Sequence, residues 1–192
     1  MIDASHGGDD IGAILPGRVE EKELTLTLAR ELRKQLEARG VRARLLRESD
    51  TDLTLERRAE ITNQEHAGLY VALHAGLPAN GVRVYWSAMT AAKPKTRSLI
   101  PLWESAQTES LGRSRSMASA VADQVRKNDL SISLLTAPLR PLNNVVAPAI
   151  AVEWAPSPAD LKPPQSAKVT ARLTSAVAEA VARVRASSEG RP

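Results

Sequence analysis

Apolar residues recur at every fourth position in three stretches of the chain, as they do along one face of an α-helix. The first helix is expected to begin near Glu21 and to end near Gly40, because glycine suits a helix C-terminus. A further helix is expected from about Thr54 to Glu65, with Thr54 as its N-cap. The periodic residues are Leu24, Leu28, Leu32 and Leu36, then Met117, Val121 and Val125, and finally Val169, Leu173, Val177 and Val181. The middle group belongs to a helix-rich segment, 102–127, which Gly112 is expected to interrupt.

Short apolar runs between these helices predict β-strands. Residues 69–73 and 149–152 are almost wholly apolar, as in strands that are covered on both faces. Residues 41–45 and 82–86 alternate between apolar and polar, which is typical of half-buried strands. Further short strands are expected at 1–3 and within 131–139. Because strands alternate with helices, the pattern predicts an α/β fold with a largely parallel central sheet and helices on both faces.

The chain shows no internal repeat, low-complexity tract or linker, so we expect a single domain over residues 1–192. Residues 187–192 are expected to form a frayed tail. The first strand begins at Met1, which predicts that an upstream segment, and any export signal within it, is missing.

Composition narrows the class of protein. Hydrophobic residues make up 43% and charged residues 25% of the chain, as in soluble globular domains, and no apolar run approaches the roughly 18 residues of a membrane span. Cysteine is absent, which excludes thiolate metal ligands, a cysteine nucleophile and disulfides. The net charge of +4 suits either an ordinary basic surface or attraction to an anionic polymer. Aromatic residues are only 3% of the chain, which argues against a nucleic-acid surface.

Three candidate chemical groups follow strand-like segments, namely His6, His74 and Glu153. If the strands are parallel, these groups meet at one edge of the sheet. Together with Glu21, the two histidines make the two-imidazole, one-carboxylate ligand set of a catalytic zinc, and Glu153 is placed to act as a general base. Taken singly, each has a structural explanation, such as a hydrogen-bonded strand-end histidine or a helix-capping charge. His66 lies in a polar helix end and is expected to be a solvent-exposed bystander.

The sequence motifs around these residues resemble those of a known enzyme family. Residues 2–13, Ile-Asp-Ala-Ser-His-Gly-Gly-Asp-Asp-Ile-Gly-Ala, resemble the opening motif of the zinc-dependent N-acetylmuramoyl-L-alanine amidases. The block that starts at Glu21, the strand that ends at His74 and the segment 148–153 resemble later motifs of that family. Between them, further matches follow in order at Arg47, Asp50, Leu55, Arg58 and Asn63. The resemblance spans residues 2 to about 183.

The resemblance implies an enzyme that hydrolyses the amide between N-acetylmuramic acid and L-alanine in peptidoglycan, outside the cytoplasm. It implies that His6, Glu21 and His74 bind Zn²⁺ and that Glu153 is the general base and acid. Asp10 is expected to support the first motif as a neighbour of the ligands. A mixed sheet of about six strands is implied as well, and we expect a monomer. The alternatives are a catalytically silent cell-wall binding module of the same fold and a zinc amidohydrolase or peptidase with another amide substrate.

The chain departs from the family pattern at three positions. Ser5 replaces the usual Gly before the first ligand, Gly76 stands where Asn is common, and Trp154 follows Glu153 where Gly is usual. These changes are expected at the rim of the site, where they would affect substrate preference. The segment 84–131 is too short for the large helical plug found in some relatives, which predicts a constitutively open site.

Overall fold

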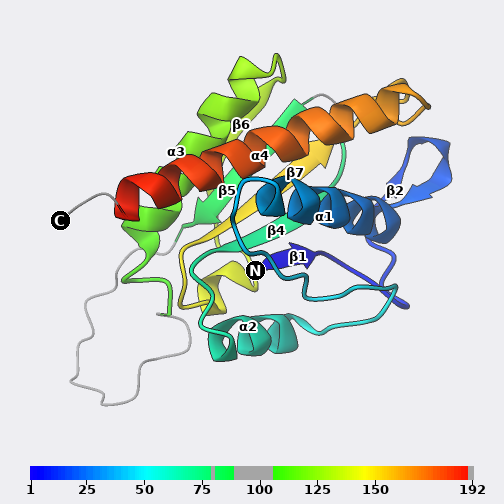
Figure 1. Cartoon of the computed structure of the whole chain (residues 1–192). Helices are drawn as coiled ribbons and strands as arrows, with labels where there is room; N and C mark the ends of the chain where they lie inside the picture. Colours follow the sequence, from blue (N-terminus) through cyan, green and yellow to red (C-terminus); the bar gives the residue numbers. More distant parts are fainter. Residues whose placement is uncertain (79–80, 89–105, 190–192) are drawn as a thin grey trace.

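The computed structural model describes residues 1–78, 81–88 and 106–189. Within these residues the fold is centred on a five-stranded sheet with the strand order β1-β4-β7-β5-β6 (Figure 1). Three of its four strand pairings are parallel, and β5 runs antiparallel to β7. The strands are β1 (Ile2–Ala4), β4 (Tyr70–Ala75), β5 (Gly81–Ser87), β6 (Ile132–Ala137) and β7 (Ala149–Ala155).

Four helices in the described residues cover the sheet, and they divide unequally between its faces. The helices α1, α3 and α4 pack on one face around the main hydrophobic core, whereas α2 and the short 3-10 helix η3 cover the other face. The predicted α/β fold with helices on both faces is therefore confirmed. The bounds are α1 (Glu21–Glu37), α2 (Leu55–Gln64), α3 (Leu111–Lys127), η3 (Leu142–Asn144) and α4 (Gln165–Glu189).

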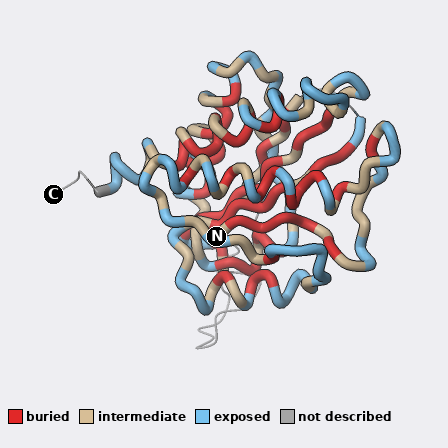
Figure 2. Tube along the Cα trace, turned by 45° about the vertical axis from the view of Figure 1, so that its right-hand side comes forward, coloured by how far each residue is buried: buried red, intermediate tan, exposed pale blue. Residues whose placement is uncertain are grey.

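The central strands are buried on both faces, as their apolar composition predicts (Figure 2). In β4, Val71 and Leu73 point into the main core, while Tyr70 and Ala72 belong to the smaller core beneath α2. Successive side chains of a strand point to opposite faces, so the same alternation directs His74 to the α2 face. His74 therefore lies on the face of the sheet that is covered by α2 and η3 alone among the described helices.

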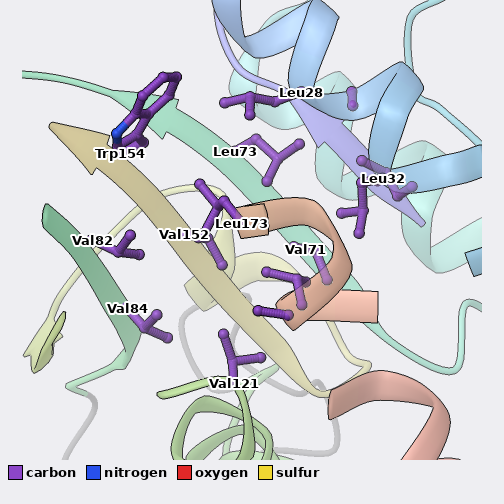
Figure 3. Close-up of a cluster of buried hydrophobic side chains, with 14 of the residues drawn as sticks. Leu28, Leu32, Val71, Leu73, Val82, Val84, Val121, Val152, Trp154 and Leu173 are labelled. Carbon is purple, nitrogen blue, oxygen red and sulfur yellow. The ribbon is translucent and has the colours of Figure 1, made fainter. Parts of the chain in front are cut away.

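Trp154 corrects one expectation about the site. Its side chain is only 3% exposed and lies in the main core with Val152 and Leu73 (Figure 3). Because Trp154 and Glu153 are adjacent in β7, their side chains point to opposite faces of the sheet. The expected position of Trp154 at the rim was wrong, and its indole contributes to packing instead.

Two predicted elements differ from the structure. Residues 41–45 do not form a strand, because only Leu45 of this segment makes a bridge, to Ile2 of β1. The described part of the mixed sheet has five strands, close to the expected number of about six. Gly112 is the second residue of α3 and lies in its first turn, so it does not interrupt the helix, which begins at Leu111.

Other boundaries shift by a few residues. His74 and Glu153 lie within β4 and β7 rather than after them. Helix α4 includes residues 187–189 of the expected tail, and residues 190–192 lie outside the described part. The prediction of an open site depends on the segment 84–131, of which residues 89–105 also lie outside the described part. Among the described residues, no helix combines the length and the apolar character needed to cross a membrane.

Candidate metal centre

The loop after β1 carries His6, and two buried arginines fix its backbone. Arg47 donates through Nε to the carbonyl of Ala4 at 2.8 Å and through Nη2 to the carbonyl of Ser5 at 3.3 Å. Arg58 donates through Nη2 to the carbonyl of His6 at 2.9 Å. His6 has a φ of 63°, a conformation that costs a non-glycine residue on the order of 1–3 kcal/mol and persists only where the surroundings hold it.

The glycine-bearing segment after His6 is also fixed in place. Lys22 donates through Nζ to the carbonyl of Gly8 and to Oδ2 of Asp50, both at 2.8 Å, and Asp50 accepts from the Gly8 amide. Gly12 has a φ of +67°, and a Cβ placed there would lie 2.7 Å from both Oε2 of Glu21 and Cδ2 of His6. Only glycine therefore allows this segment to pass so close to both side chains.

Glu21 opens α1, and the hairpin of β2 (Ile14–Leu15) and β3 (Val19–Glu20) leads the chain to it. Its side chain is buried, and both oxygens accept hydrogen bonds. Oε1 accepts from the Ala75 amide at 3.0 Å, and Oε2 accepts from the Ala13 amide at 2.9 Å. Burial alone would raise the pKa of Glu21, but the bonds from His6, His74 and these amides outweigh it and hold the pKa well below its usual range. The side chain of Glu21 is therefore ionised at neutral pH.

His6, Glu21 and His74 come together at one point. Oε2 of Glu21 lies 3.2 Å from Nε2 of His6, and Oε1 lies 3.0 Å from Nδ1 of His74. One ligand atom from each residue lies within 4.8 Å of the other two. Ligand atoms of a tetrahedral zinc with bonds of about 2.1 Å lie about 3.4 Å apart, so small side-chain adjustments bring this set to that spacing. Two imidazoles and one carboxylate are a donor set that suits Zn²⁺.

The nitrogens of both rings that face away from Glu21 also have partners. Nδ1 of His6 lies 2.8 Å from Oδ2 of Asp10, the residue that the sequence suggested as a neighbour of the ligands. Nε2 of His74 lies 2.9 Å from Oγ of Ser5. The hydrogen bond to Glu21 and, against the opposing effect of burial, the bond to Asp10 raise the pKa of His6. An oxygen on the outer nitrogen is the arrangement that orients a metal-binding histidine.

Glu153 lies beside His74, because the two residues are partners in the parallel pairing of β4 with β7. Its Oε1 accepts from Nη2 of Arg83 at 2.7 Å, and its Oε2 accepts from the hydroxyl of Tyr85 at 2.8 Å. Burial, and then the bond to this carboxylate, raise the pKa of Tyr85, so its hydroxyl stays protonated and donates. A cleft of about 380 Å³ is lined by Glu21, His74, Gly76, Tyr85 and Glu153, among others. Two of the three candidate ligands, Glu21 and His74, thus share one cleft with Glu153.

The structure brings together every site residue that the sequence singled out. His66 lies apart from them, exposed just after α2, as expected. Arg83 and Tyr85 were not recognised as site residues from the sequence. Their alternation in 82–86 already placed them on one face of a strand, but only the antiparallel pairing of β5 with β7 sets Arg83 opposite Glu153.

This arrangement defines the class of protein. It is an α/β domain with a candidate metal centre and a neighbouring carboxylate at the carboxyl end of its parallel strands, as in a metal-dependent hydrolase. The sequence pattern of the Amidase_3 family, described as N-acetylmuramoyl-L-alanine amidase, matches residues 1–183. The chain belongs to this family, which confirms the resemblance seen in its motifs.

Curated relatives match parts of the chain. AmiC, an N-acetylmuramoyl-L-alanine amidase of Neisseria meningitidis, is 36% identical over 111 residues, which cover 56% of this chain and 26% of that protein. AmiA, an N-acetylmuramoyl-L-alanine amidase of Salmonella typhimurium, is 40% identical over 75 residues, which cover 39% of this chain and 26% of that protein. The matched part is therefore about a quarter of the length of these relatives.

Solved structures show the same fold. The catalytic domain of CwlV, an N-acetylmuramoyl-L-alanine amidase from Bacillus (Paenibacillus) polymyxa, superposes with a TM-score of 0.73 at 19% identity and covers 95% of each chain. The N-acetylmuramyl-L-alanine amidase Ami1 from Mycobacterium smegmatis gives a TM-score of 0.71 at 20% identity, over 95% of this chain and 94% of that one. At these identities the likeness establishes the fold alone.

Proposed function

We propose that this chain is the catalytic domain of a zinc-dependent N-acetylmuramoyl-L-alanine amidase, which hydrolyses the amide between N-acetylmuramic acid and L-alanine in peptidoglycan. The observation that supports it most is the convergence of His6, Glu21 and His74, with ligand atoms within 4.8 Å of one another. Glu21 and His74 of this set line the same cleft as Glu153. Family membership supplies the bond to be cut.

In this proposal His6, Glu21 and His74 hold the zinc, which would supply Lewis-acid polarisation of the amide carbonyl and a lowered pKa for water. Glu153 accepts a proton from the attacking water and delivers it to the nitrogen of the leaving L-alanine. The role of Glu153 as proton acceptor is supported by its strand pairing, in which it is the partner of the proposed ligand His74.

Arg83 and Tyr85 orient the proton acceptor. They donate to different oxygens of Glu153, which fixes the plane of the carboxylate. A carboxylate offers about four lone-pair sites, so each oxygen of Glu153 keeps one acceptor site for a proton from water. The two donors thus fix the carboxylate in place without using up its capacity as a base.

The substrate and the setting follow from the same proposal. Peptidoglycan lies outside the cytoplasm, so the domain would act in the periplasm or the cell wall. The net charge of +4 favours approach to an anionic polymer. Residues 1–192 would act as a monomeric domain.

The test combines metal analysis with digestion of purified peptidoglycan. The purified chain should retain about one zinc per molecule and release stem peptides that begin with L-alanine, as identified by mass spectrometry. Glu153→Gln should keep the zinc and lose the release of peptides. Zinc without such peptides would favour an amidohydrolase or peptidase with another substrate, and binding of peptidoglycan without zinc or cleavage would favour a silent binding module.

A further inference from the structure

His74 offers two ring nitrogens, and its surroundings distinguish them. Nδ1 faces Oε1 of Glu21 at 3.0 Å, inside the cluster, while Nε2 faces Oγ of Ser5 at 2.9 Å, on the outer side of the ring. A neutral imidazole carries one proton, and the unprotonated nitrogen is the one that binds a metal. If one ring nitrogen carries the proton and donates it to an oxygen outside the cluster, the other nitrogen is therefore free to bind the metal.

We propose that the Ser5 hydroxyl accepts the Nε2–H of His74 and thereby presents Nδ1 to the zinc. Ser5 is then a positioning residue, which acts through His74 and does not itself touch metal or substrate. This inference rests on the proposed zinc-dependent function, and it assigns a role to a residue that stands where the family usually has glycine.

Ser5 is fixed well enough to perform this role. Its amide donates to the carbonyl of Leu73 at 3.2 Å, and its own carbonyl accepts from Oγ1 of Thr25 at 2.8 Å and from Nη2 of Arg47 at 3.3 Å. The residue is only 6% exposed. With its backbone held by these three bonds, Ser5 keeps its hydroxyl 2.9 Å from Nε2 of His74.

The other histidine has the same arrangement. His6 turns Nε2 to Oε2 of Glu21 and Nδ1 to Oδ2 of Asp10. The two rings lie edge to face, with centroids 5.6 Å apart and planes at 81°. Each ring thus has an outer oxygen that holds the proton and an inner nitrogen that faces Glu21. Ser5 does for His74 what Asp10 does for His6, with a neutral oxygen in place of a charged one.

The test measures zinc affinity by competition with a chromophoric chelator. Ser5→Ala removes the acceptor and should weaken zinc binding about 10- to 100-fold, as is typical when the outer partner of a metal-binding histidine is lost. Ser5→Thr keeps the hydroxyl and should stay within about threefold of the unaltered chain. The matched control is Ser116→Ala, because Ser116 is an exposed serine on α3 whose hydroxyl donates to the carbonyl of Gly112 and which lies outside the ligand cluster. The zinc affinity of this variant should not change. An affinity of Ser5→Ala within threefold of the unaltered chain would overturn the proposal.

A second measurement needs no substitution. Nitrogen-15 NMR of the zinc-loaded chain should show the His74 proton on Nε2, and a proton on Nδ1 would overturn the proposal even if the Ser5 variants fail to fold. The experiments distinguish the proposed zinc-dependent function from the role of Ser5. Absence of zinc binding in the unaltered chain would remove both the proposed function and the role of Ser5. Zinc binding and amide cleavage that are indifferent to Ser5→Ala would remove the role of Ser5 alone.

Discussion

Gly76 leaves the space that the carboxylate of Glu153 occupies. A Cβ at position 76 would lie 2.3 Å from Oε1 of Glu153, far inside van der Waals contact. The backbone has little freedom to withdraw, because the Gly76 amide donates to the carbonyl of Trp154 at 3.0 Å. The glycine that replaces the family's usual asparagine therefore lies against the proposed proton acceptor, where any side chain would displace it.

Gly76→Ala is expected to reduce turnover without releasing zinc. The added methyl group would move Oε1 of Glu153 away from Arg83, and a displacement of about 1 Å in a catalytic group costs roughly 100-fold in rate. The rate of peptide release from peptidoglycan and the zinc content of the same sample measure the two effects separately.

Gly68→Ala is the matched control, because a Cβ at position 68 meets no atom within 4 Å. It should leave both turnover and zinc content unchanged. If Gly76→Ala also left turnover unchanged, either Glu153 can be placed elsewhere without loss or it takes no part in the reaction.

Arg83→Met and Tyr85→Phe are each expected to lower kcat by about tenfold or more. Each removes one hydrogen bond to a charged carboxylate, and such bonds contribute about 1.5–3 kcal/mol. Zinc content should be unaffected, because both side chains hydrogen-bond to Glu153 and neither belongs to the ligand cluster. Arg126→Met removes an exposed ion pair with Asp123 on α3 and should leave kcat unchanged. Zinc loss in Arg83→Met would show instead that Arg83 supports the metal centre.

The main features of the fold were predictable because they depend on local periodicity. Leucines at every fourth position predicted α1, because one buried face of a helix leaves this pattern in the sequence. Apolar runs predicted β4 and β7, because strands that are covered on both faces contain few polar residues. The region 41–45 shows the limit of this reasoning. Its alternation suits a strand, but a strand also needs continuous pairing with a neighbour, and only Leu45 makes a bridge, to Ile2 of β1.

In the candidate site, too, some features could be predicted from the sequence and others could not. The ordered motifs singled out His6, Glu21, His74 and Glu153, which the fold does bring together. The contacts that orient them depend on strand register between distant segments, which local pattern does not contain. Ser5 meets His74 because β1 pairs with β4, so the serine that stands where glycine is usual supplies a hydrogen-bonding oxygen that sequence alone did not reveal.

Breaking the buried ion pair between Asp3 and Arg58 is expected to lower the free energy of unfolding by about 3–5 kcal/mol. Their side chains are 1% and 3% exposed, and Asp3 also accepts a hydrogen bond from the buried hydroxyl of Tyr70. Arg58→Met would leave the Asp3 carboxylate without its charged partner and would release the carbonyl of His6. Urea-induced unfolding measures the change.

The neighbouring Arg57 provides the control for this prediction. It forms an exposed pair with Glu60, in which the side chains are 50% and 47% exposed, and such pairs contribute about 0–1 kcal/mol. Arg57→Met should therefore change stability by less than about 1 kcal/mol. Equal effects of Arg57→Met and Arg58→Met would contradict a special role for the buried pair.

The stabilisation that zinc gives to the fold is expected to grow as the pH rises from 6 to 8. The hydrogen bond that His6 donates to Glu21 raises the pKa of His6 above its ordinary 6.5 despite burial. Protonated His6 therefore stabilises the metal-free fold fully below pH 6.5, and this contribution is lost as the pH rises through the raised value. Zinc requires neutral His6, so its binding strengthens over the same range.

Both effects act in the same direction on one measurable quantity, the difference in Tm between zinc-loaded and chelator-treated protein. That difference should be larger at pH 8 than at pH 6. In His6→Ala it should be small at every pH, because a ligand and the titrating group are lost together. His66→Ala should behave like the unaltered chain, since His66 is exposed and lies outside the ligand cluster. A difference in Tm that stays constant or shrinks toward pH 8 would mean that His6 does not exchange a proton for the metal, and its place in the ligand set would have to be given up.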